Sequence, residues 1–168
     1  MKIILSQKED IDVIFELYEA ATAFQMKVGT NNWKGFERSM VEDEITEKRH
    51  FVINDDNQVT ATFVLAFNDP IIWKEADKDP AVYIHRIATH PNFRGRSYVR
   101  KIVDWVAGYA KKLDKNYVRL DTTSGNELLN QYYIKCGFTF KGNSEIEWTK
   151  ELPEHYKDGS FALFEIKI

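Results

Sequence analysis

The sequence predicts an α/β fold in which a twisted, mixed central sheet carries helices on both faces. Segments typical of strands and of helices alternate along the chain and do not gather in separate halves. An extended apolar run over residues 81–89 leads into residues 99–113, whose apolar positions recur at helical spacing. A length of 168 residues fits one domain spanning residues 1–168.

The N-terminal part of the chain predicts two helices and three strands. Residues 3–5 form a short strand, and Ser6 with Glu9 makes a capping-box pattern before a helix. A break at residues 29–32 precedes a weaker helix over 33–48. Residues 51–53 and 58–67 then form a hairpin, and apolar residues on both faces of its second strand predict a central place in the sheet. The apolar face of the first helix contains Ile11, Ile14, Phe15, Tyr18 and Ala21.

The C-terminal part begins with a polar connection over residues 68–80, which we interpret as a surface loop or lid containing Trp73. Strand 81–89 and helix 99–113 follow, and strand 117–120 ends at Asp121. A helix over 126–136 is closed by Gly137, as expected for a left-handed cap. Strands at 138–141 and 161–168 complete the sheet.

Composition excludes several classes of protein. A formal net charge of −3 argues against nucleic-acid binding. The single cysteine, Cys136, excludes an internal disulfide and is expected to be a small buried side chain, and the histidines lack the spacing of a metal site. With no signal-peptide core and no long apolar run, we expect a cytoplasmic protein that binds neither membrane nor metal.

A basic turn precedes the helix at residues 99–113. Gly95 permits a tight turn, and Arg94 and Arg96 carry forked donors suited to phosphate oxygens. Unpaired N–H groups and the helix dipole favour an anion at the start of the helix. The turn therefore predicts a phosphate site, although a solvated loop would have the same sequence.

The order of these segments resembles the GNAT superfamily of acyl-CoA-dependent N-acyltransferases. Its central motif, Q/R-x-x-G-x-G/A, corresponds here to residues 94–99, with Ser97 and Val99 in place of small motif residues. Its second motif is matched by Asn126, Tyr133 and Gly137-Phe138 at the usual spacings. The resemblance covers most of the chain, and the departures at Ser97 and Val99 imply altered contacts with the cofactor.

The resemblance implies transfer of an acetyl group from acetyl-CoA to a primary amine of a small molecule or peptide, directly and in a ternary complex. The alternative is a catalytically weak module that binds CoA or another ligand. Homodimers are frequent in the superfamily and are compatible with this sequence. The implied cofactor-binding residues are Ile87, Ala88, Thr89, Arg94, Gly95, Arg96, Ser97, Tyr98, Val99, Asn126 and Tyr133.

Amide formation requires a base and an acid, and the sequence offers candidates for both. His85 is the first candidate for the base, because it shares one face of strand 81–89 with Ile87 and Thr89 by the period of two, and no carboxylate stands there. A hydrogen bond across the sheet is its alternative role. Asp121 and Glu127 are the reserve bases.

Tyr133 matches the tyrosine that many superfamily members use to protonate the departing thiolate. Its alternative role is packing on the core, which Tyr132 could fill instead. Asn126 would position the cofactor or cap its helix.

Overall fold

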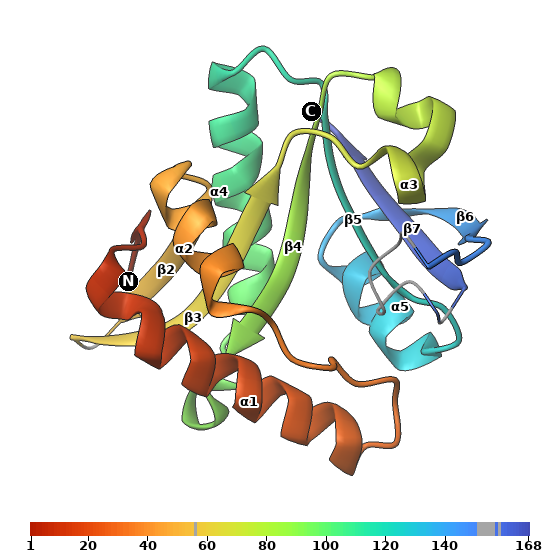
Figure 1. The fold of residues 1–168 in the computed structure, drawn as a ribbon. Helices are drawn as coiled ribbons and strands as arrows, with labels where there is room; N and C mark the ends of the chain where they lie inside the picture. Colours follow the sequence, from red (N-terminus) through yellow and green to blue (C-terminus); the bar gives the residue numbers. More distant parts are fainter. Residues whose placement is uncertain (56, 151–156, 158) are drawn as a thin grey trace. The chain divides into compact units, whose positions relative to one another are not determined.

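The structure is a computed structural model that describes residues 1–55, 57–150, 157 and 159–168. Seven strands make one mixed sheet in the order β1-β2-β3-β4-β5-β7-β6, which confirms the predicted fold class (Figure 1). The chain divides into two compact units, residues 1–65 with 85–98 and residues 66–84 with 99–168. Strand β4 (Ala81–Thr89) contributes to both units, and one domain over residues 1–168 stays a prediction.

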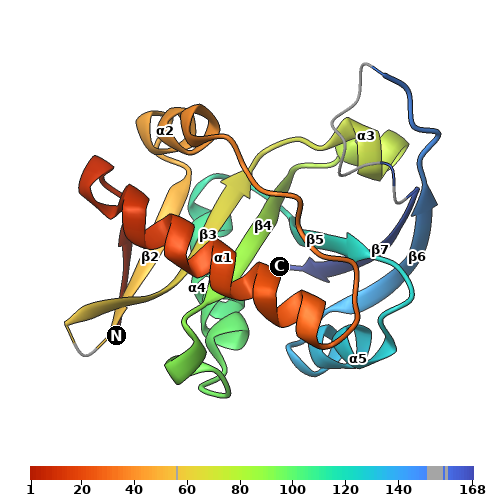
Figure 2. The ribbon, with the colours of Figure 1, turned by 60° about the horizontal axis from the view of Figure 1, so that its bottom comes forward.

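The first unit contains the antiparallel strands β1 (Lys2–Leu5), β2 (His50–Asp55) and β3 (Gln58–Ala66). The last residue of β3, Ala66, lies in the second unit. Helices α1 (Ile11–Lys27) and α2 (Arg38–Thr46) supply side chains to one core with β2 and β4. Figure 2 shows α1 lying across β2 and β3. The buried members of this core are Ile11, Ile14, Leu17, Tyr18, Val41, Val52 and Ala88.

Two expectations for the first unit were wrong in detail. The capping box is formed by Gln7 and Asp10, because the Ser6 hydroxyl is buried and bonds His50 Nδ1 at 2.8 Å. The helix expected over residues 33–48 exists only at Arg38–Thr46. Gly35 has a φ of 98°, which is incompatible with a continuous right-handed helix.

The second unit is built around β5 (Tyr117–Thr123), which pairs in parallel with the first residues of β4 and antiparallel with β7 (Ser160–Lys167). Strand β6 (Thr139–Glu145) pairs antiparallel with β7. Helix α4 (Tyr98–Lys112) lies in this unit except for its first residue. Helix α5 (Glu127–Lys135) lies beside β6 in both ribbon views.

The connection between β3 and β4 differs from the predicted surface loop. It contains the short helix α3 (Pro70–Trp73), followed by a 3-10 helix at Lys74–Lys78. Trp73 is only 4% exposed and packs on Tyr83, with ring centroids 5.7 Å apart. The Asp69-Pro70 pair starts α3, because the Asp69 carboxylate caps the helix and proline suits its first position. Within the described residues, no helix is both long and apolar enough to cross a membrane.

Candidate active site

The basic turn of the first unit has the backbone geometry that the sequence predicts. Gly95 and Ser97 have φ values of 81° and 57°, so both residues occupy the left-handed region. Backbone in this conformation can direct neighbouring N–H groups toward one anion. A Cβ on Gly95 would contact nothing within 4 Å, so the turn is open on that side. An open turn with this backbone geometry can hold an anion such as a phosphate group.

The two arginines of the turn pack against aromatic rings of the same unit. The Arg94 guanidinium lies 4.3 Å from the centroid of the Phe24 ring and donates to the carbonyl oxygen of Ala20 at 3.0 Å. The Arg96 guanidinium lies 4.4 Å from the centroid of Phe93. Both arginine residues are exposed. Their side chains can therefore reach a phosphate group after giving up contacts at the surface.

The remaining predicted cofactor residues beside the turn differ in exposure. Ile87 and Thr89 are half-buried, whereas Ala88 is buried in the core of the first unit. Tyr98 is also buried, and its hydroxyl donates to Asp55 Oδ2 at 2.9 Å, so its side chain anchors the start of α4. Val99 is half-buried at the same helix start, in the second unit.

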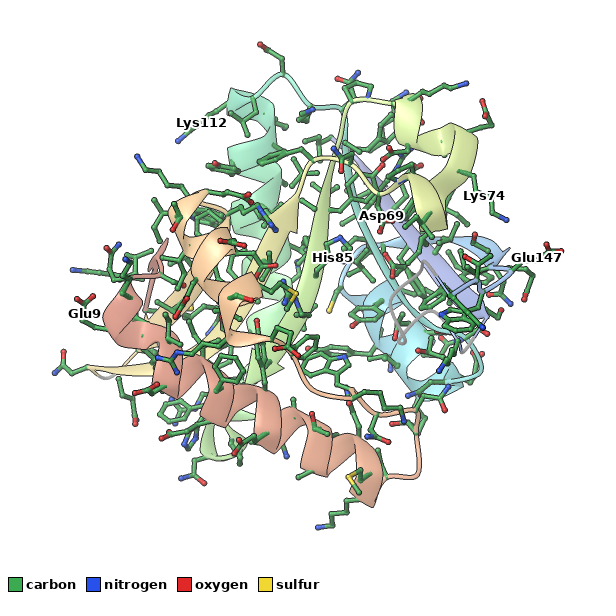
Figure 3. All side chains as sticks on the ribbon, in the orientation of Figure 1. Glu9, Asp69, Lys74, His85, Lys112 and Glu147 are labelled. Carbon is green, nitrogen blue, oxygen red and sulfur yellow. The ribbon has the colours of Figure 1, made fainter. Side chains whose placement is uncertain are left out.

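His85 lies on β4 and is half-buried (Figure 3). The next residue, Arg86, has a φ of 50°, which departs from the regular extended geometry assumed by the period-of-two prediction. The guanidinium of Arg86 pairs with the buried Glu44 carboxylate of α2. Strand β4 is therefore irregular directly after His85.

In the second unit, Asp121 lies near the end of strand β5, ahead of α5. Its Oδ1 atom is buried and has no hydrogen-bond partner among the residues that the structure describes. Burial raises the pKa of Asp121 to about 7, and the negative charge of Asp69 raises it further. Such a carboxyl group can accept or release a proton near neutral pH.

Two side chains of the α3 region accompany Asp121. Carboxylate oxygens of Asp69 and Asp121 lie within 4.8 Å of one another. Burial also raises the pKa of Asp69 to about 6, although the Ile72 N–H, which donates to this carboxylate, opposes the shift. The indole N–H of Trp73 faces Asp121 and lowers its pKa, but the contact falls outside hydrogen-bond geometry.

A buried arginine fixes the position of this region. Arg119 is 1% exposed, and its guanidinium donates to the Ala76 carbonyl oxygen at 2.6 Å and to the Tyr83 hydroxyl at 3.2 Å. The Tyr83 hydroxyl donates to Asp77 Oδ1 at 2.6 Å, and the backbone N–H of Asp69 donates to the same oxygen at 2.6 Å. This chain of hydrogen bonds connects β5 to the residue that starts α3.

Helix α5 carries the predicted acid. The Tyr133 ring packs on Phe164 at a centroid distance of 5.3 Å, whereas Tyr132 is 39% exposed, so the expectation that Tyr132 takes the packing role was wrong. Burial raises the pKa of Tyr133 well above its usual value, with further contributions from Tyr132 and Asp121. The phenol therefore stays protonated at neutral pH.

The other α5 candidates have local partners. The Asn126 side chain accepts a hydrogen bond from the Leu129 N–H at 3.0 Å, which is the capping role. Glu127 is exposed, and its Oε1 accepts a hydrogen bond from Gln131 at 2.7 Å. Cys136 is buried, as expected of a small packing residue.

Sequence reasoning missed Asp69 and the part that Trp73 takes beside Asp121. The Asp-Pro pair was a signal for a helix start, but no sequence pattern places that start beside β5.

Comparisons with known proteins agree with this architecture. The model of the acetyltransferase (GNAT) family matches residues 14–138. An uncharacterized N-acetyltransferase of Bacillus subtilis, YesJ, is 25% identical over 142 residues, which is 80% of this chain and 79% of the relative.

Two solved GNAT-family structures have the same fold. An acetyltransferase from Listeria monocytogenes aligns with a TM-score of 0.79 at 20% identity, covering 99% of this chain and 94% of that one. Another from Streptococcus agalactiae aligns with a TM-score of 0.77 at 21% identity, covering 99% and 95%. Since the family model spans most of the sequence, the chain belongs to the acetyltransferase (GNAT) family.

Proposed function

We propose that the protein is an N-acetyltransferase that moves an acetyl group from acetyl-CoA directly to a primary amine of a small molecule or peptide. Membership of the family supports acyl transfer, and acetyl-CoA supplies the thioester. The observation that carries the proposal is the carboxyl group of the half-buried Asp121, which has a pKa of about 7 and a buried oxygen, Oδ1, without a partner among the described residues.

The acceptor requires such a group because an alkylamine with a pKa of about 10.4 is almost entirely protonated at pH 7. A base whose pKa lies near the working pH is ionised often enough to accept a proton and weak enough to release it again. Asp121 meets this condition. It therefore replaces His85 as our first candidate for the base, and the role of His85 stays a prediction. The exposure of Glu127 and its bond to Gln131 favour a surface role instead.

Tyr133 is the proposed acid. Its raised pKa keeps the phenol protonated at neutral pH, so a proton is available for the departing thiolate. The turn at Arg94, Gly95, Arg96 and Ser97 is the proposed pyrophosphate site, with Tyr98 and Val99 at the helix start. Backbone groups of Ile87, Ala88 and Thr89 and the side chain of Asn126 are the remaining proposed contacts with the cofactor.

The first experiment measures free thiol released from acetyl-CoA with a panel of polyamines, aminoglycosides, amino acids and peptides. We expect amine-dependent release and a Tyr133→Phe variant that turns over at least about a hundredfold more slowly, with nearly unchanged CoA affinity. Unchanged turnover in Tyr133→Phe would remove this residue from the acid role. Thermal stabilisation by CoA without release to any amine would favour the binding module.

A further inference from the structure

We infer that Asp69 and Asp121 together bind the acceptor amine in its protonated form, so that aliphatic ammonium compounds are better acceptors than aromatic amines. This inference rests on the proposed function. It adds a second carboxylate, from the start of α3, that contacts the acceptor.

The first argument is the proximity of two carboxyl groups, one on the buried Asp69 and one on the half-buried Asp121. Asp69 is 8% exposed, and one of its carboxylate oxygens lies within 4.8 Å of a carboxylate oxygen of Asp121. Two negative charges at this separation repel one another, and burial strengthens the repulsion. A cation between them offsets this unfavourable electrostatic energy. An alkylammonium group carries both the positive charge and the N–H donors that the unpartnered Asp121 Oδ1 lacks among the described residues.

The second argument is a buried hydrogen-bond donor beside the Asp121 carboxyl group. Trp73 is 4% exposed, and its indole Nε1 is buried without a hydrogen-bond partner in the described part of the chain. The N–H nevertheless faces Asp121 closely enough to lower the pKa of that residue. A buried donor and a buried acceptor that stop short of bonding indicate a site that tightens when a ligand enters.

The third argument is that Asp69 is held rigidly. Its carboxylate accepts a hydrogen bond from the Ile72 N–H at 3.3 Å, and its own backbone N–H donates to Asp77 Oδ1. Asp77 is fixed in turn by Tyr83 and, through Tyr83, by Arg119. A charged group held in this way can bind a cation without a large loss of side-chain freedom.

The proton balance of the reaction is consistent with this arrangement. The ammonium nitrogen gives one proton to the ionised Asp121 and attacks the acetyl carbon, so a C–N bond forms while the C–S bond breaks. The thiolate takes the proton of Tyr133, and a second proton from the nitrogen restores the phenol. Asp121 then releases its proton to solvent, and Asp69 changes no bond.

The test compares benzylamine, which is protonated at pH 7, with aniline, which is not. In Asp69→Asn, asparagine can still cap α3, so the fold is retained while the charge is lost. We expect the KM for benzylamine to rise about tenfold while kcat/KM for aniline stays within about twofold. Glu75→Gln is the matched control, because it removes an exposed carboxylate from the following 3-10 helix. It should change neither value.

Equal effects of Asp69→Asn on the two amines, or no effect on either, would overturn the inference. Calorimetric titration with benzylammonium chloride provides a readout that needs no turnover, and we expect about tenfold weaker binding to Asp69→Asn than to the wild type. Equal binding to both proteins would also overturn the inference. If the wild-type protein transfers acetyl groups to no amine, only the proposed function is contradicted. The titration still decides whether Asp69 and Asp121 bind the benzylammonium ion.

Discussion

The environment of the Asp121 side chain disfavours its negative charge, and the pH dependence of the enzyme's turnover should reflect this. Burial and the charge of Asp69 raise its pKa to about 7, so the ionised base disappears as pH falls through this value. We expect kcat to rise with pH around 7 and to be about a hundredfold lower at pH 5. A pH series of initial rates at saturating substrate measures this dependence.

The same series in Asp69→Asn identifies the group that titrates. Removing a neighbouring negative charge makes Asp121 easier to ionise, so the midpoint should move to lower pH. Glu75→Gln should leave it unchanged. An unshifted midpoint in Asp69→Asn would assign the titration to another group.

The departure from the family motif at Ser97 has an energetic consequence. Ser97 has a φ of 57°, and this conformation costs a residue with a Cβ roughly 1–2 kcal/mol. We expect Ser97→Gly to raise the free energy of unfolding by about 1 kcal/mol, measured by urea denaturation. Gly95→Ala should lower it by a similar amount, because Gly95 has a φ of 81°. A less stable Ser97→Gly variant would show that the serine hydroxyl outweighs the backbone strain.

At the scale of elements, a buried histidine joins β2 to α1 and to Ser6, the residue that follows β1. His50 begins β2, and its ring bonds the Ser6 hydroxyl at 2.8 Å and the Tyr18 hydroxyl at 3.1 Å. Burial lowers its pKa to about 3, and the charges of Arg86 and Arg49 lower it further. The folded protein therefore keeps His50 neutral where the unfolded chain already binds a proton.

This difference makes the contribution of His50 to stability fall as pH drops below about 6.5, and it continues to fall toward pH 3. Between pH 7 and pH 5 the loss should be about 2 kcal/mol, and it should be absent from His50→Gln. Asp69 and Asp121 change stability in the opposite direction in both proteins, so the measurement is the difference in unfolding free energy between them. A pH-independent difference would contradict the assignment.

The elements that sequence predicts best are those with a long, regular apolar pattern. The hairpin expected at residues 51–53 and 58–67 is observed at His50–Asp55 and Gln58–Ala66, and the helix expected at 99–113 is observed at Tyr98–Lys112. Helix α3 has four residues, too few to show a period, and was missed. The early residues of the helix expected at 33–48 are irregular because Gly35 takes a positive φ.

At the scale of the whole molecule, the motifs at residues 94–99 and 126–138 were sufficient for the family, because their spacing is visible in the sequence. The sequence was not sufficient to identify the candidate base, Asp121. Its pKa depends on burial and on Asp69, a neighbour 52 positions earlier in the chain. Sequence also could not show that Tyr133 rather than Tyr132 packs on the core, since adjacent helix residues differ only in direction. Tertiary structure decides both points.

The central claim is that this chain acetylates amines with Asp121 as the base. The most direct measurement is turnover of Asp121→Asn beside the wild type, followed by thiol release and by the mass of the acetylated amine, with CoA binding measured by thermal shift. We predict equal amounts of thiol and acetylated amine from the wild type, at least about a hundredfold lower turnover in the variant, and an unchanged shift with CoA. A fully active Asp121→Asn variant would contradict the claim.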